Sequence, residues 1–163
     1  MNNRKIHFIT GLPRSGSTLL TNIILQNPKF YSSTTSSLLE LLIQIRNNWD
    51  SFVGHKSNPQ GQDKWVVMKS ILHTYHNTDR PVIFDKSRGW MDKIEFIEKL
   101  NGPSKFIVCV RNMEDIVSSF EKLYRKNRAE FEINSESNNI KMKTLKSRIE
   151  LWTDDNGGVI GSP

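Results

Sequence analysis

Hydrophobic residues recur along this chain in two patterns, which are short apolar runs and longer stretches with helical spacing. The apolar runs predict strands that are buried on both faces, as in a parallel sheet. They cover residues 5–10, 81–85 and 105–110, with a shorter candidate at 30–32. The run 105–110 is apolar at every position between its lysine and its end, which predicts a central strand.

The longer stretches place apolar residues three and four positions apart, which predicts amphipathic helices. These helices are expected at residues 17–26, 38–49, 64–76, 90–100, 112–126 and 140–152, with a loop at 54–63. Ser37 followed by Glu40 resembles a capping box at the start of one helix. Strands alternate with helices, which predicts an α/β fold with a mainly parallel central sheet flanked by helices. A single domain, 1–163, is expected, beginning with a P-loop-like strand–loop–helix unit.

Composition narrows the possible functions. The chain has 23 Lys and Arg against 17 Asp and Glu, a net charge of +6, which favours an anionic partner. No apolar run is long enough for a membrane span or a signal peptide, and Cys109 is the single cysteine, so an intrachain disulfide is excluded. The basic residues show neither zinc-finger spacing nor interleaved aromatics, so no nucleic-acid partner is expected. We predict a cytoplasmic protein without a membrane partner, and we expect His73 and His76 to be surface polar groups.

The segment from Gly11 to Thr18 has the features of a phosphate-binding loop. It follows a predicted strand and opens a predicted helix, where main-chain N–H groups and the helix dipole favour an anion. The N–H groups of Ser15, Gly16, Ser17 and Thr18 would point to that anion. The two glycines have the Walker A spacing, but Ser17 stands where a Walker loop has lysine. The cation is instead Arg14, whose planar fork suits phosphate or sulfate oxygens.

A second candidate anion site follows the strand 105–110. Arg111 lies at the carboxyl end of that strand, where parallel α/β sheets bind their ligands. Ser119 comes eight residues later on the predicted helix. Both side chains would face one anion that lies across the strand end and the helix.

Over roughly residues 5–125, these two elements together resemble the sulfotransferases that use 3′-phosphoadenosine 5′-phosphosulfate (PAPS). The family's first motif resembles residues 12–20 and binds the 5′-phosphosulfate, and its second has Arg and Ser spaced like Arg111 and Ser119 and binds the 3′-phosphate. Residues 82–88 resemble the family's middle strand, whose lysine would be Lys86, facing the sulfuryl group. The resemblance implies that PAPS is the co-substrate, that no metal is needed, and that the catalytic residues are Arg14 and Lys86. The cofactor-binding residues would be Arg14, Ser15, Gly16, Ser17, Thr18, Arg111 and Ser119. The acceptor would be a hydroxyl or amine of a small molecule, a carbohydrate or a peptide.

The chain departs from that family in two places. Residues 31–37 contain no carboxylate, and no histidine follows Lys86 closely, so the catalytic base is not assigned. Glu40 and Asp85 are the nearest candidates for it, although Asp85 also suits a partner of Lys86 or Arg14. Nothing after Trp152 matches the family's late glycine-rich and basic loop, so we expect the domain to be incomplete at its C-terminus. Neither the acceptor nor the oligomeric state is indicated.

Two other functions stay open. The first is a P-loop kinase or NTPase, in which residues 82–85 form a Walker B strand and Asp85 holds Mg²⁺. The missing lysine at Ser17 counts against this function. The second is a catalytically inactive nucleotide-binding module, which the unassigned base and the short C-terminus would allow.

Overall fold

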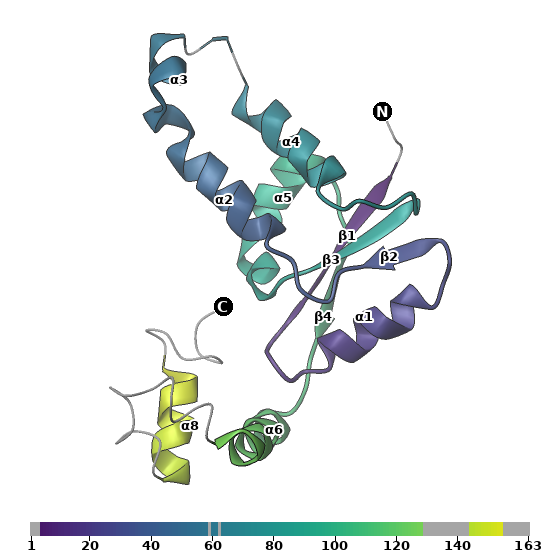
Figure 1. Cartoon of the computed structure of the whole chain (residues 1–163), viewed down its shortest axis with the longest axis vertical. Helices are drawn as coiled ribbons and strands as arrows, with labels where there is room; N and C mark the ends of the chain where they lie inside the picture. Colours follow the sequence, from purple (N-terminus) through teal and green to yellow (C-terminus); the bar gives the residue numbers. More distant parts are fainter. Residues whose placement is uncertain (1–3, 59, 62, 129–143, 155–163) are drawn as a thin grey trace. The chain divides into compact units, whose positions relative to one another are not determined.

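The structure is a computed structural model that describes residues 4–58, 60–61, 63–128 and 144–154 (Figure 1). It divides into two compact units. The first, the sheet unit, comprises Met1–Thr10 and Thr18–Val108. The second, the loop unit, comprises Gly11–Ser17 and Cys109–Pro163. The predicted phosphate loop therefore belongs to the same unit as the segment after the last strand.

The sheet has four strands in the order β2-β3-β1-β4. They are β1 (Lys5–Gly11), β2 (Phe30–Ser32), β3 (Val82–Lys86) and β4 (Phe106–Cys109). β3 pairs in parallel with both β1 and β2. All four strands were expected from the apolar runs, and the α/β class with a parallel sheet is confirmed.

One expectation about the sheet is wrong, because β4 lies at its edge and not at its centre. The two inner strands are β3 and β1, and Phe8 and Ile9 of β1 are fully buried. In β4, by contrast, the side chain of Val108 is 42% exposed. An apolar run of four residues is compatible with an edge strand or an inner strand, because the run itself does not determine which strands lie beside it.

The helices follow the predicted order with local differences. Their bounds are α1 (Ser17–Leu25), α2 (Leu38–Asn48), α3 (Val53–Ser57), α4 (Lys64–Thr74), α5 (Ile94–Asn101), α6 (Met113–Lys126) and α8 (Leu145–Thr153), with 3₁₀ turns η1 (Trp49–Ser51) and η2 (Arg88–Lys93). The short helix α3 replaces part of the expected loop at 54–63. The expected helix at 140–152 begins at Leu145 in the structure, and residues 140–143 lie outside the described residues.

The helix expected at 90–100 begins differently in the structure, because residues 88–93 form the 3₁₀ turn η2. Gly89 lies close to α2, because a Cβ at this position would be 2.6 Å from Cδ2 of Leu39. Trp90 is fully buried and donates a hydrogen bond from its indole nitrogen to Asp85. These tertiary contacts outweigh the helical spacing of the sequence.

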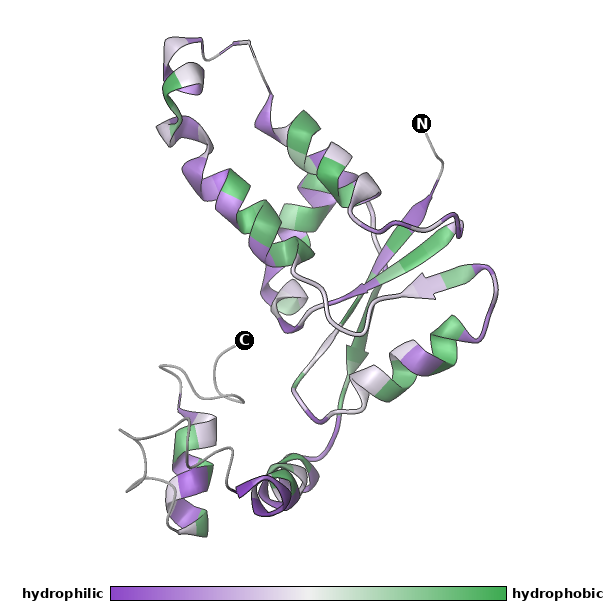
Figure 2. Cartoon of the chain, viewed as in Figure 1, coloured by the Kyte–Doolittle hydropathy of each residue, from purple (hydrophilic) through white to green (hydrophobic). Residues whose placement is uncertain are grey.

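The main core lies between the sheet and the helices α2, α4 and α5. Its buried side chains come from β1, β3, these helices and η2, and they are Ile6, Phe8, Leu38, Leu39, Leu42, Met68, Leu72, Ile83, Trp90, Phe96, Ile97 and Leu100. Figure 1 shows α1 on the other side of the strands from α2, α4 and α5. Figure 2 shows hydrophobic residues alternating with hydrophilic ones along α2 and α4, as the amphipathic pattern predicted.

The expected capping box at the start of α2 is absent. The Ser37 side chain makes no capping hydrogen bond, and the main-chain N–H of Leu38 is satisfied by Oγ of Ser36 at 3.1 Å. The N–H of Ser37 instead donates to the hydroxyl of Tyr75 at 3.3 Å. The polar segment before α2 is therefore fixed by tertiary contacts as well as by local ones.

The loop unit has a smaller apolar cluster of its own. Its buried members are Ile116 and Tyr124 of α6 and Trp152 of α8. Leu12, in the phosphate loop, packs against this cluster. Both helices and the loop therefore share one core.

Candidate active site

The phosphate loop has a backbone that glycine makes possible. Gly11 and Gly16 have φ values of 142° and 100°, which L side chains rarely adopt. A Cβ on Gly11 would lie 2.5 Å from the main-chain oxygen of Cys109, closer than any real contact. The loop therefore turns sharply at its first glycine and passes close to the end of β4.

Arg14 is the one residue other than glycine with positive φ among the described residues, at 65°. This left-handed conformation costs free energy and persists only when surrounding contacts hold it. Two such contacts come from the second predicted element. Nε of Arg14 donates to Oγ of Ser119 at 2.9 Å, and Nη1 of Arg111 donates to the main-chain oxygen of Arg14 at 3.1 Å. The structure thus brings together three residues that the sequence placed in two separate motifs.

Ser15 adds an observation that bears on ligand binding. Its Oγ is buried and has no hydrogen-bond partner among the described residues. A buried hydroxyl without a partner is costly, and it is satisfied when a ligand supplies an acceptor. Ser15 lies between Arg14 and Gly16, so an anion in this loop would provide that acceptor. The loop residues therefore suit an anionic ligand group such as a phosphate or a sulfate.

The loop leads directly into α1, which begins at Ser17. Ser17 is buried and Thr18 is exposed, and the first turn of α1 contains no acidic residue. The partial positive charge at this helix end is therefore not neutralised by its own side chains.

Arg111 also lies near a carboxylate. Its Nε is 3.7 Å from Oδ2 of Asp115, one helical turn along α6, and both side chains are well exposed. An exposed pair at this distance is weak, and it leaves Arg111 able to bind a phosphate. The Asn112 side chain caps α6 by accepting the N–H of Glu114 at 2.8 Å, so the helix begins at Met113, two residues after Arg111.

Lys86 ends β3 in the sheet unit, as the sequence predicted. Its Nζ donates to Oγ1 of Thr18 at 3.1 Å and to the main-chain oxygen of Thr34 at 2.6 Å. Its main-chain N–H donates to Oγ of Ser33 at 2.8 Å. The Lys86 ammonium is therefore in direct contact with the hydroxyl of Thr18, a residue predicted as part of the phosphate loop.

The surroundings of Asp85 differ from those expected of a catalytic base, a Mg²⁺ ligand or a partner of Lys86 or Arg14. It is fully buried, its Oδ2 is 2.7 Å from Nε2 of His76, and its Oδ1 accepts the indole N–H of Trp90 at 2.7 Å. With both oxygens engaged inside the protein, Asp85 fits neither a general base nor a Mg²⁺ ligand. Its observed partners are also different from Lys86 and Arg14.

The expectation that His76 is a surface group is wrong, since its side chain is only 5% exposed. The helix expected at 64–76 would contain both His73 and His76, but α4 ends at Thr74. His76 therefore follows the helix and turns toward the sheet. No local signal marks it, because its partner Asp85 lies on the next strand.

Glu40, the other carboxylate considered as a base, is exposed on α2. No group of three or more His, Cys, Asp or Glu side chains that could hold a metal ion occurs among the residues the structure describes. Within that same part of the chain, no helix is both long and apolar enough to cross a membrane.

Comparison with known families agrees with the motifs. The profile of the sulfotransferase family matches residues 7–157, which includes the phosphate loop, Lys86, Arg111 and Ser119. A comparison with curated protein sequences gives no match. The family profile covers most of the chain, and both predicted anion-binding motifs lie within it. The chain therefore belongs to the sulfotransferase family.

Proposed function

We propose that this protein transfers a sulfuryl group from PAPS to a hydroxyl or amine acceptor. The observation that carries the proposal is the set of contacts around Arg14. The guanidinium of Arg14 binds Ser119, and Arg111 binds the main chain of Arg14. Two cations, a hydroxyl and a glycine-rich loop thus lie together, which suits a ligand with several anionic groups.

Each residue has a role in this proposal. The main-chain N–H groups from Ser15 to Thr18 would bind the 5′-phosphosulfate, together with Oγ of Ser15. Arg111 and Ser119 would bind the 3′-phosphate. These assignments follow the family motifs in the sequence, and the partnerless hydroxyl of Ser15 supports the first of them.

The reaction is a displacement at sulfur. The acceptor oxygen or nitrogen forms a bond to sulfur, while the bond from sulfur to the bridging phosphate oxygen breaks. The electron pair leaves with 3′-phosphoadenosine 5′-phosphate, and the acceptor proton passes to water. Arg14 and Lys86 would stabilise the negative charge that develops on the bridging oxygen.

The kinase or NTPase function has weaker support. It requires a carboxylate near the nucleotide that is open to Mg²⁺, and residues 82–85 supply only Asp85. Both oxygens of Asp85 bind groups inside the protein. The acceptor, a small molecule, a carbohydrate or a peptide, stays a prediction. The cytoplasmic location also stays a prediction.

Calorimetric titration tests the proposal. We expect 3′-phosphoadenosine 5′-phosphate to bind without metal, and Arg111→Ala to weaken it by about 1.5–3 kcal/mol, or roughly tenfold to a hundredfold, for a lost charged hydrogen bond. Lys126→Ala is the matched control, because it removes an exposed cation from α6, the helix that follows Arg111. Tighter binding of Mg²⁺–ATP, or an equal effect of both variants, would refute the assignment. Binding without any transfer to a panel of acceptors would favour the inactive nucleotide-binding module.

A further inference from the structure

A cluster of three buried polar side chains is centred on Asp85, the residue that precedes Lys86 in the chain. It consists of the Asp85 carboxylate, the His76 imidazole and the Trp90 indole, joined by two contacts of 2.7 Å. Asp85 and Trp90 are fully buried, and His76 is 5% exposed. None of these three side chains has a role in the proposed sulfuryl transfer.

Stability alone does not account for this arrangement. Burying a carboxylate is costly, and apolar residues of similar size in place of a buried polar pair are often neutral or stabilising. A buried hydrogen-bonded pair does, however, fix the relative orientation of the segments that it joins. Here it joins the end of β3 to the turn after α4 and to η2.

The end of β3 is where Lys86 stands, next in the chain after Asp85. The Asp85 side chain anchors the strand toward His76 and Trp90. Oγ of Ser33 holds the main chain of Lys86 itself at 2.8 Å. A shift of Asp85 would therefore shift the backbone from which the lysine extends.

The turn that carries His76 also supports the other contact of Lys86. Tyr75 accepts the N–H of Ser37 through its hydroxyl, and its ring lies 5.0 Å from the His76 ring. Ser37 closes the segment that contains Thr34, whose main-chain oxygen accepts Nζ of Lys86. His76 therefore fixes the backbone before Lys86 through Asp85, and Tyr75 fixes the segment whose main-chain oxygen accepts a hydrogen bond from Lys86.

We propose that His76 is a positioning residue, which acts through Asp85 to hold the Lys86 ammonium in place for sulfuryl transfer. The proposal rests on the proposed function for the role of Lys86. Its first test does not need the donor. Trace acetylation followed by mass spectrometry measures the reactivity of Lys86, with the exposed Lys126 as an internal reference.

His76→Phe removes the hydrogen bond and keeps a ring, whereas His76→Gln keeps an N–H donor. We expect the reactivity of Lys86 relative to Lys126 to rise about fivefold in His76→Phe, as for the loss of one ordinary hydrogen bond. We expect it to stay near the wild-type value in His76→Gln. Should His76→Phe fail to fold, Trp90→Phe removes the other donor to Asp85 and is expected to raise the reactivity in the same way. Unchanged reactivity in the folded variant overturns the proposal.

The second test uses transfer activity. We expect His76→Phe to lower kcat with little change in the donor KM, and His76→Gln to restore it. In a Lys86→Ala background, His76→Phe should have no further effect, because the group on which it acts is gone. An equal loss in both backgrounds would show a general structural role and overturn the proposal. If no donor binds at all, the proposed function fails, and the acetylation result still decides whether His76 holds Lys86.

Discussion

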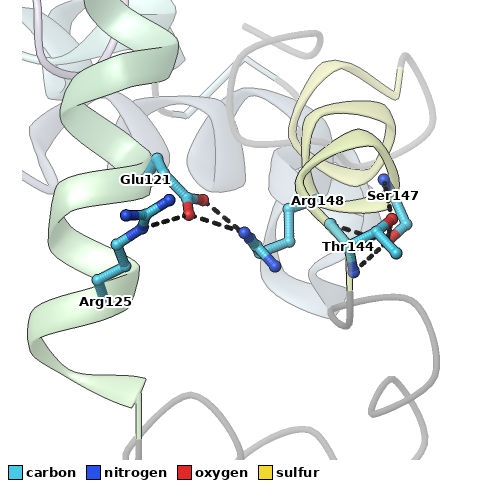
Figure 3. Close-up of polar contacts among 5 residues, drawn as sticks. All are labelled: Glu121, Arg125, Thr144, Ser147 and Arg148. Atoms are coloured by element: carbon cyan, nitrogen blue, oxygen red, sulfur yellow. Dashed lines mark hydrogen bonds and ion pairs between the residues drawn. The ribbon is translucent and has the colours of Figure 1, made fainter.

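The ion pair between α6 and α8 allows a quantitative prediction (Figure 3). Glu121 accepts hydrogen bonds from Nε and Nη2 of Arg148 at 2.9 and 2.7 Å, and both side chains are about nine-tenths buried. Arg125, which is mostly exposed, also donates to Glu121 at 2.8 Å. The guanidinium of Arg148 lies 4.5 Å from the centre of the Tyr124 ring.

Replacing Arg148 with Met keeps the apolar stem and removes the charge. Glu121 is then left buried with Arg125 as its remaining partner. Removing one member of a buried ion pair costs about 3–5 kcal/mol, and we expect about 3 kcal/mol here because Arg125 still binds. Lys146→Met is the matched control, since it removes an α8 cation that is exposed and 3.9 Å from Glu150. That variant should cost about 0.5 kcal/mol or less.

The effect has a predictable pH dependence. The hydrogen bond from Arg148 is the main cause that holds the pKa of Glu121 below its usual value, while burial opposes it. Because the folded-state pKa is lowered, the stabilisation is present above the unfolded pKa of about 4.3 and is lost as the pH falls through the folded value. The difference in stability between the wild type and Arg148→Met should therefore be largest near neutral pH and should shrink in acid.

Hydrogen exchange of the α6 and α8 amides is a suitable assay, because it reports the opening of these helices separately from the sheet unit. Measurements at pH 7 and about pH 3 bracket the unfolded pKa. The reasoning fails if Arg148→Met costs no more than Lys146→Met at pH 7. It fails as well if the difference between wild type and Arg148→Met is the same at both pH values.

Three further variants test the candidate site. Gly11→Ala should destabilise the protein by about 1–3 kcal/mol in urea unfolding, because φ is 142° and the new Cβ would meet the Cys109 oxygen. A wild-type midpoint would show that the turn is not held as described. Ser119→Ala should lower stability by about 1 kcal/mol or less, for the lost hydrogen bond to Arg14, and weaken binding of 3′-phosphoadenosine 5′-phosphate up to about tenfold. Unchanged affinity would remove Ser119 from the site. Lys86→Ala should lower kcat by about 10²–10³ with a smaller change in nucleotide affinity, as for a group that stabilises developing charge. An equal loss of kcat and of nucleotide affinity would make Lys86 a binding residue only.

The parts of this structure that sequence could predict depend on local patterns. The unit formed by β1, the loop and α1 is recognisable because Gly11 and Gly16 flank a short turn between an apolar run and a helix. The proximity of Ser119 and Arg111, which both contact Arg14, was predictable because they lie eight positions apart, at a strand end and on the helix that follows. In each case, the determining residues lie within about two helical turns of one another.

The parts that could not be predicted depend on contacts between distant segments. The edge position of β4 follows from the order of all four strands, which its own residues do not encode. Burial of His76 requires Asp85, which lies nine positions away on another element. Glu121 and Arg148 are separated by 27 positions, and each resembles an ordinary charged residue of a helix surface. Local sequence patterns do not mark these side chains as buried, because their partners lie in distant segments.

The contacts of the phosphate loop also have a consequence for how the protein is made. Arg14 depends on Ser119, which is 105 positions later, and Leu12 packs against a cluster that includes Trp152. A ribosome adds about 5–20 residues per second, so the loop leaves the exit tunnel on the order of ten seconds before its last supports are synthesised. A nascent chain that ends before α8 would carry the complete glycine motif without the core that supports it. The phosphate loop should therefore gain its supporting contacts only after α8 has been synthesised.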